Sequence, residues 1–149
     1  FDQALAEMQA RGIAEADPSH DIDGWDAAAK TAALVNALMG SIMTPHHVLR
    51  SGMRELTRPD VREAVGRNKR IRLVASGSRQ GGKVKARVEP EVLDISDPLA
   101  GVSDLQNALY LDTDLLGEVG IIQRSGSLTQ TAYALLADLA RISQRLRDS

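Results

Sequence analysis

Two stretches of alternating residues, separated by a glycine-rich segment, constrain the fold of this chain most strongly. The first stretch carries Ile71, Leu73 and Ala75 at every second position. The second carries Val84, Ala86 and Val88 in the same pattern, with Lys85 and Arg87 between them. Residues at every second position share one face of a β-strand, and paired glycines favour tight turns. The sequence therefore predicts a β-hairpin whose turn lies within residues 78–82.

A second strand pair follows the first after a break in the chain. Asp97 and Pro98 interrupt the extended pattern, since proline cannot donate to a β-ladder. We predict strands over residues 106–111 and 118–123, joined by a turn at residues 112–114.

Helical spacing dominates both ends of the chain. Apolar residues at helical spacing predict a first helix over residues 1–11 and, after an ordered loop at 13–23, a second helix that Asp23 caps and Gly40 ends. Thr44 and Pro45 favour a short helix ending near Gly52, followed by a brief strand at 53–56.

Two further helices complete the pattern. Thr57 is positioned to cap a helix that begins near Pro59 and ends near Asn68, and residues 128–142 form an amphipathic C-terminal helix. We therefore predict an α+β fold, with a mainly antiparallel or mixed sheet covered on one face by helices. A length of 149 residues fits one domain over residues 1–149.

Composition narrows the classes of function. The formal net charge of −2 gives no basic surface for nucleic acid, and no apolar run approaches the roughly 20 residues that cross a bilayer. The absence of cysteine removes disulfides and thiolate chemistry and suits a reducing compartment. We expect a cytoplasmic protein with no nucleic-acid partner and no membrane contact. The three histidines lack ligand spacing, so we expect no metal site.

Carboxylates are unusually dense in one segment, which is followed by a lysine. The acids are Glu15, Asp17, Asp21, Asp23 and Asp26, and Lys30 lies one helical turn after the last of them. Carboxylates can hold an ammonium group while a lysine orients or protonates an oxygen, which suits a zwitterionic amino acid. Helix capping and an ordinary i,i+4 ion pair explain the same residues more commonly. From the residues alone, both interpretations stay open.

The same segment carries a family resemblance. Residues 12–18 read Gly-Ile-Ala-Glu-Ala-Asp-Pro, and residues 24–30 read Gly-Trp-Asp-Ala-Ala-Ala-Lys after Asp21. This run resembles the signature region of homoserine dehydrogenases, and weaker similarity continues in order along nearly the whole chain. The resemblance implies an NAD(P)-dependent oxidoreductase that interconverts L-homoserine and L-aspartate 4-semialdehyde in the aspartate pathway to threonine and methionine. This chain would be its substrate-binding part.

The resemblance also assigns roles to individual residues. Glu15 matches a substrate-binding glutamate, Asp21 and Asp26 match acids near the amino and hydroxyl ends of the substrate, and Lys30 matches an active-site lysine. Lys30 and Asp26 are therefore the expected catalytic residues. A lysine whose pKa is lowered by burial and by its neighbours can relay the hydroxyl proton, and Asp26 would keep it aimed.

The sequence departs from the family pattern at two places. Ile13 stands where the family usually has tyrosine. Ser125, Gly126 and Ser127, our candidate cofactor-binding residues, stand where the family usually has a glycine-rich loop near the nicotinamide. These departures leave open a similar oxidoreductase with a different small polar substrate.

The family's dinucleotide-binding Rossmann half has no counterpart in this chain. The glycines near residues 78–82 join two strands rather than opening a helix, so they do not predict a phosphate loop. We expect the isolated chain to bind NAD(P) weakly and to be inactive, which leaves a non-catalytic dimerisation or binding module as the other alternative. By resemblance, a homodimer would form around Leu109, Leu111 and Ile121.

Overall fold

The computed structural model describes residue 10 and residues 19–103, 106–126 and 128–148 of the chain. These residues form two compact units, residues 1–100 and residues 101–149. The predicted helix over residues 1–11 lies, apart from Ala10, outside the described residues. Each unit is described by itself below.

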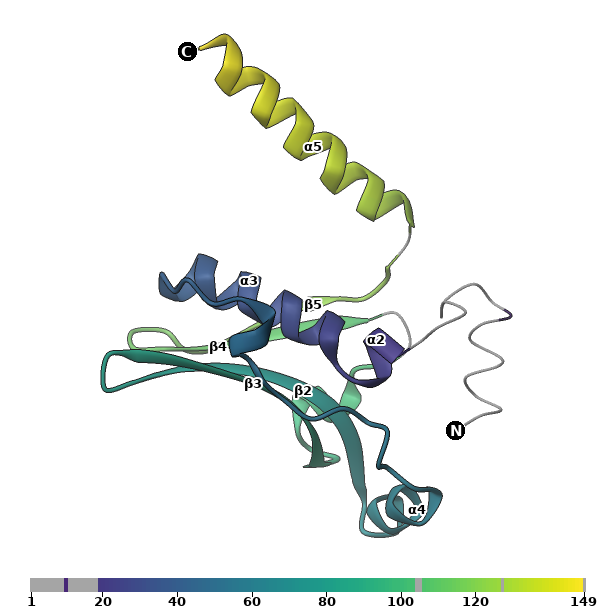
Figure 1. Cartoon of the computed structure of the whole chain (residues 1–149). Helices are drawn as coiled ribbons and strands as arrows, with labels where there is room; N and C mark the ends of the chain where they lie inside the picture. Colours follow the sequence, from purple (N-terminus) through teal and green to yellow (C-terminus); the bar gives the residue numbers. More distant parts are fainter. Residues whose placement is uncertain (1–9, 11–18, 104–105, 127, 149) are drawn as a thin grey trace. The chain divides into compact units, whose positions relative to one another are not determined.

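The first unit is built on a three-stranded mixed sheet (Figure 1). The strand order is β1-β3-β2, in which β1 (Leu49–Arg50) runs parallel to β3 (Lys83–Asp94) and β2 (Lys69–Gln80) runs antiparallel to it. The helices of this unit are α2 (Ser19–Ile22), α3 (Trp25–Met39), the 3-10 helix η1 (Pro45–His47) and α4 (Arg58–Gly66). The predicted α+β class is confirmed, and the sheet is mixed.

The predicted hairpin is confirmed and is longer than the alternating pattern indicated. Its register runs from Lys69 opposite Asp94 to Gln80 opposite Lys83. Only Gly81 and Gly82 form the turn, with φ of 57° and 77°. Two successive residues with positive φ match the right-handed twist of a hairpin, and glycine adopts this backbone without a steric cost. The turn is therefore narrower than the predicted segment 78–82.

Helix α3 packs on this hairpin and forms the core of the first unit. Its buried face meets alanine and valine side chains of β3, and the buried cluster is Ala28, Ala32, Val35, Val48, Ala86 and Val88. Small side chains allow a close approach: a Cβ atom added at Gly77 of β2 would lie 2.5 Å from Cγ1 of Val35. Close packing on the sheet therefore fixes the position of α3 and of the side chains that it carries.

The predicted start of helix α4 at Thr57 is confirmed. The Thr57 hydroxyl accepts a hydrogen bond from the Asp60 amide, while the Asp60 carboxylate accepts from the amide and the hydroxyl of Thr57. These two hydrogen bonds, that of the hydroxyl first, hold the pKa of Asp60 below its ordinary value. This reciprocal capping fixes the first turn of α4.

Three local predictions in the described part were wrong. The strand near residues 53–56 lies instead at Leu49–Arg50, where backbone pairing with β3 is available. Asp23 does not cap α3: the cap position belongs to Gly24, with φ 77° and no side-chain cap, and a short helix, α2, precedes it. The second hairpin turns at residues 114–116 rather than 112–114.

The second unit contains the antiparallel hairpin β4 (Asn107–Thr113) and β5 (Gly117–Gln123), followed by helix α5 (Leu128–Arg147). The predicted strand pair and C-terminal helix are confirmed. The Tyr110 ring packs over Gly120, where an added Cβ would lie 2.7 Å from its Cε1. Exposed apolar side chains line α5: Tyr133, Leu135, Leu136, Leu139, Ile142 and Leu146.

Candidate functional site

The acidic segment is described from Ser19 onward, so the predicted substrate residue Glu15 lies outside the described residues. Asp21 is exposed on α2, and its carbonyl oxygen accepts a hydrogen bond from the Gly24 amide at 3.0 Å. Asp26 and Lys30 lie in the first two turns of α3. The structure thus places three of the predicted site residues around the start of one helix, which the core holds against the sheet.

Asp26 and Lys30 are brought together as an ion pair. Nζ of Lys30 lies 2.6 Å from Oδ2 of Asp26, one helical turn away. The two side chains are 72% and 49% exposed. The i,i+4 pair that the spacing predicted is therefore present, and the described residues do not bury the lysine. Burial of Lys30 would have to come from a surface beyond these residues.

Asp23 has a structural role that sequence reasoning missed. Its two carboxylate oxygens accept hydrogen bonds from Nε and NH2 of Arg54 at 2.9 and 3.1 Å. Its carbonyl oxygen accepts from Arg50. A fork-shaped guanidinium that meets a carboxylate through two bonds gives a fixed geometry. Both carboxylate oxygens of Asp23 are engaged in this contact, whereas Asp21 is exposed and Asp26 pairs with Lys30.

Glycine allows the acidic segment to pack this closely on residues 50–54. A Cβ added at Gly52 would lie 2.5 Å from the Ile22 carbonyl oxygen and 2.7 Å from Cα of Asp23. The Met53 amide donates to the same Ile22 carbonyl at 2.8 Å. Backbone contact and side-chain pairing therefore hold the two segments together.

The sole tryptophan of the chain reinforces the same junction. The Arg50 guanidinium lies 3.9 Å from the centre of the Trp25 ring, and the His46 ring meets Trp25 edge-on with centroids 5.1 Å apart. A guanidinium over an indole face is a favourable cation–π contact. Arg50 and Arg54 lie four residues apart opposite an acidic segment, and this charge complementarity was the sequence signal that could have identified them.

The predicted cofactor residues lie in the other unit. Ser125 and Gly126 connect β5 to α5, and Ser127 lies outside the described residues. Ser125 and Gly126 belong to the second unit, whereas Lys30 belongs to the first. In the described residues, no strand leads through a glycine-rich turn into a helix, which is the arrangement that cradles a dinucleotide. These residues therefore do not fit NAD(P) by that mechanism.

Two negative findings apply to the described part of the chain only. Among residues 19–103 and the later described segments, no three histidine, cysteine, aspartate or glutamate side chains gather closely enough to hold a metal ion. Within the same residues, no helix combines the length and the apolarity that a bilayer crossing requires.

Comparison with known proteins agrees with the fold. A family model described as homoserine dehydrogenase matches residues 1–140. The chain is 36% identical to the NAD(+)-dependent homoserine dehydrogenase of Pseudomonas canavaninivorans, covering 97% of this chain and 41% of that protein. It is 33% identical to homoserine dehydrogenase of Lactococcus lactis, covering 99% of this chain and 35% of that protein.

A solved structure shows the same architecture. The crystal structure of homoserine dehydrogenase from S. aureus superposes with a TM-score of 0.86 at 32% identity, covering 96% of this chain and 36% of that one. The α+β arrangement with its mixed sheet is thus the architecture of part of a larger oxidoreductase. The chain belongs to the homoserine dehydrogenase family. It spans between about one third and two fifths of the length of the curated relatives that it matches.

Proposed function

We propose that this chain forms the substrate-binding part of an oxidoreductase that interconverts L-homoserine and L-aspartate 4-semialdehyde with NAD(P). The observation that carries the proposal is the Asp26–Lys30 pair, 2.6 Å apart at the start of α3. Two oppositely charged groups one turn apart suit an amino acid that carries an ammonium group, a carboxylate and a hydroxyl. Membership of the family supports this choice of substrate.

The residues have distinct roles in this proposal. Lys30 binds the hydroxyl oxygen and holds or accepts its proton, while Asp26 keeps the ammonium group of Lys30 aimed. Glu15 and Asp21 bind the substrate at its polar ends. The nicotinamide supplies hydride acceptance when it is bound. Because the described residues do not fit a dinucleotide, we assign the main cofactor contacts to another part of the protein, with Ser125, Gly126 and Ser127 as secondary candidates.

The exposure of Lys30 accords with a site that is completed from outside this chain. A lysine that is 72% exposed is well hydrated, and desolvation is what makes such a group a useful proton carrier. A dinucleotide-binding part that covers α3 would supply that desolvation. For the same reason we expect the isolated chain to be inactive.

Assembly and location follow from the same proposal. Leu109 and Ile121 are cross-strand partners in the β4–β5 hairpin, and Leu111 lies on the same face. Ile121 is 57% exposed. We propose that this apolar face pairs with a second copy in a homodimer, for which the expected sedimentation profile is dimeric. We also place the enzyme in the cytoplasm, in the pathway to threonine and methionine.

The decisive experiment uses the longer protein that includes a dinucleotide-binding part. We expect reduction of NAD⁺ or NADP⁺ with L-homoserine, and a loss of about 100-fold or more in kcat for Lys30→Ala, in line with general acid–base contributions. Asp26→Asn should lower kcat less, because the lysine remains but loses its orienting partner. Lys83→Ala, in the exposed end of the first hairpin, is the matched control and should leave turnover unchanged.

Two other outcomes correspond to the alternatives. Turnover of another small hydroxy amino acid in preference to L-homoserine would indicate a similar oxidoreductase with a different substrate, as the departures at Ile13 and Ser125 allow. Binding of the amino acid without any reduction of cofactor would indicate a non-catalytic module. Full activity in Lys30→Ala would contradict the site itself.

A further inference from the structure

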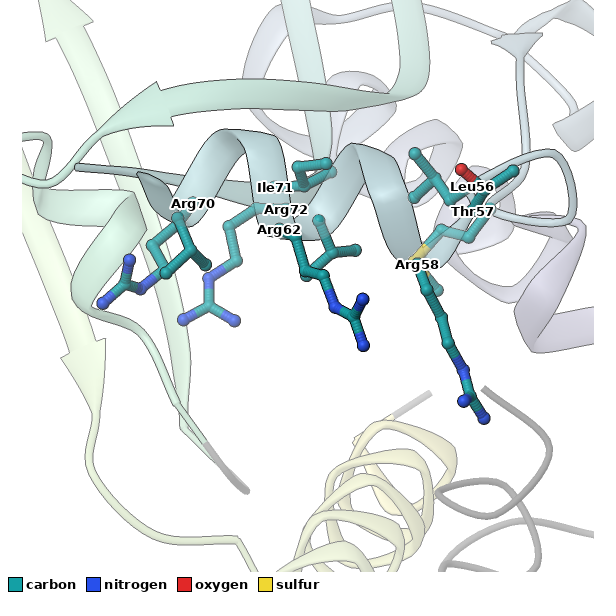
Figure 2. A pocket seen from close by; sticks show the side chains of 10 residues that line it. Leu56, Thr57, Arg58, Arg62, Arg70, Ile71 and Arg72 are labelled. Carbon is teal, nitrogen blue, oxygen red and sulfur yellow. The ribbon is translucent and has the colours of Figure 1, made fainter. Parts of the chain in front are cut away.

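A separate pocket lies between α4 and the beginning of β2, and none of Asp21, Asp26 and Lys30 lines it (Figure 2). Its volume is about 520 Å³, within the range of small-molecule sites. Its apolar lining comes from Met53, Leu56, Val61, Val65 and Ile71. Such a lining suits a ligand with an apolar body rather than a bare ion.

Four arginines complete the lining of this pocket. Arg58 and Arg62 lie one turn apart on α4. Arg70 and Arg72 lie two residues apart on β2, which places both on the same face of the strand. Figure 2 shows the four side chains extending to the same side of α4. Four positively charged side chains therefore line the same pocket as the apolar residues.

The described residues provide no acidic partner for these four arginines. Other arginines in the first unit do have one: Arg54 pairs with Asp23, and Arg67 pairs with Glu63 at 2.8 Å. In residues 19–103 and the later described segments, no carboxylate lies within ion-pair distance of the pocket arginines. Clustered like charges repel one another unless an anion neutralises them. The pocket therefore presents positive charge that no carboxylate of the described residues neutralises.

Arg72 is held in place but is incompletely satisfied. Its NH2 donates to the Ala100 carbonyl oxygen at 2.9 Å, which fixes the guanidinium. Its Nε is shielded from solvent and has no hydrogen-bond partner, the one such side-chain atom among the described residues. Arg70 is also tethered, through NH1 to the Lys69 carbonyl oxygen at 2.9 Å. Guanidinium groups that are already oriented lose less entropy on binding an anion.

We infer that this pocket binds a small organic dianion attached to an apolar body, either a phosphate monoester or a dicarboxylate. The guanidinium groups bind the dianion through paired N–H donors, because their fork matches both phosphate and carboxylate oxygens. Val61, Val65 and Ile71 contact the apolar body. The inference concerns a site distinct from the proposed substrate site and does not depend on it.

Calorimetric titration of the chain at low ionic strength tests this assignment. The ligands are phenyl phosphate and phthalate, with inorganic phosphate for the charge alone and benzyl alcohol for the apolar body alone. We expect one of the two aromatic dianions to bind about 10-fold or more tightly than inorganic phosphate, and which one binds identifies the class of anion. Equal binding of all anions, or no binding of either aromatic dianion, would overturn the inference.

Matched variants localise the binding. Arg62→Gln and Arg70→Gln should each weaken the preferred dianion about 10-fold, the effect of losing a charged hydrogen bond. Arg67→Gln is the control, since this arginine does not line the pocket and pairs with Glu63. Equal weakening in Arg67→Gln would mean that net charge alone causes the effect, and this outcome would contradict a specific binding site in the pocket. A dimer that Arg62→Gln dissociates, without dianion binding, would assign the surface to a second copy and overturn the inference as well.

Discussion

The guanidinium of Arg54 meets both carboxylate oxygens of Asp23 across 31 positions of sequence, with Nε 2.9 Å from Oδ1 and NH2 3.1 Å from Oδ2. This contact joins the acidic segment to the turn that follows β1. Asp23 does not cap α3, which is the role that helix-capping rules predicted for it. The segment that leads into α3 is therefore held by a pair that helix-capping rules do not predict, although the opposite charges of the two segments indicate it.

Replacement of Arg54 by alanine should loosen this junction without unfolding the protein. The arginine is 63% exposed and the aspartate 34%, so solvent screens the pair and we expect a loss of up to about 1 kcal/mol in the free energy of unfolding. Amide exchange at Met53, which donates to Ile22 next to Asp23, should become faster. Arg67→Ala breaks a single i,i+4 pair within α4 and should leave Met53 exchange unchanged; equal exchange in both variants would count against the clamp.

Gly52→Ala should destabilise the first unit more strongly. The new Cβ would lie 2.5 Å from the Ile22 carbonyl oxygen and 2.7 Å from Cα of Asp23, and both are backbone atoms that cannot rotate away. We expect a cost of about 1–3 kcal/mol, the range for overpacking. Gly66→Ala, with nothing within 4 Å of the added Cβ at the end of α4, is the matched control and should be neutral or slightly stabilising. Equal melting temperatures in the two variants would contradict this account.

Sequence patterns predicted those elements of the fold that local forces determine. The alternation from Ile71 to Val88 and the paired glycines specified a hairpin, because strand periodicity and turn chemistry act within a few residues. Thr57 specified the start of α4 for the same reason. The sequence did not predict the exact ends of these strands, because backbone pairing extends to Lys69 and Gln80, beyond the alternating apolar residues.

The candidate site was only partly accessible to the same reasoning. The Asp26–Lys30 pair follows from helical spacing and was predicted. The Arg54–Asp23 pair and the stacking of Arg50 on Trp25 join segments more than 20 residues apart, and no local rule specifies such partners. The position of β1 at Leu49–Arg50 was missed for the same reason, because it exists only through its pairing with β3.

Arg50→Gln should expose Trp25, whose fluorescence reports on this junction alone because the chain has no other tryptophan. The guanidinium lies 3.9 Å from the ring centre, so its loss should shift the emission to longer wavelength and cost about 0.5–1 kcal/mol. Arg67→Gln removes a guanidinium remote from the ring and should leave the emission unchanged. An unshifted spectrum in Arg50→Gln would show that the stacking does not persist in solution.

The cap of α4 should give the first unit a specific dependence on acid. Hydrogen bonds from the Thr57 hydroxyl and amide lower the pKa of Asp60 from its ordinary 3.8, so the folded protein favours the charged carboxylate. This contribution to stability is complete above pH of about 4 and is lost as the pH falls through the lowered pKa of the folded state. Asp60→Asn should therefore melt below the wild type at pH 7, and the two melting temperatures should converge as the pH falls through the lowered pKa of Asp60 in the folded state. Thr57→Ala removes the hydroxyl, whose hydrogen bond lowers the pKa of Asp60 most. In the Thr57→Ala background, Asp60→Asn should therefore lower the melting temperature at pH 7 by less than it does in the wild type. A gap between wild type and Asp60→Asn that is constant from pH 7 to pH 2 would mean that the charge of Asp60 does not stabilise the cap.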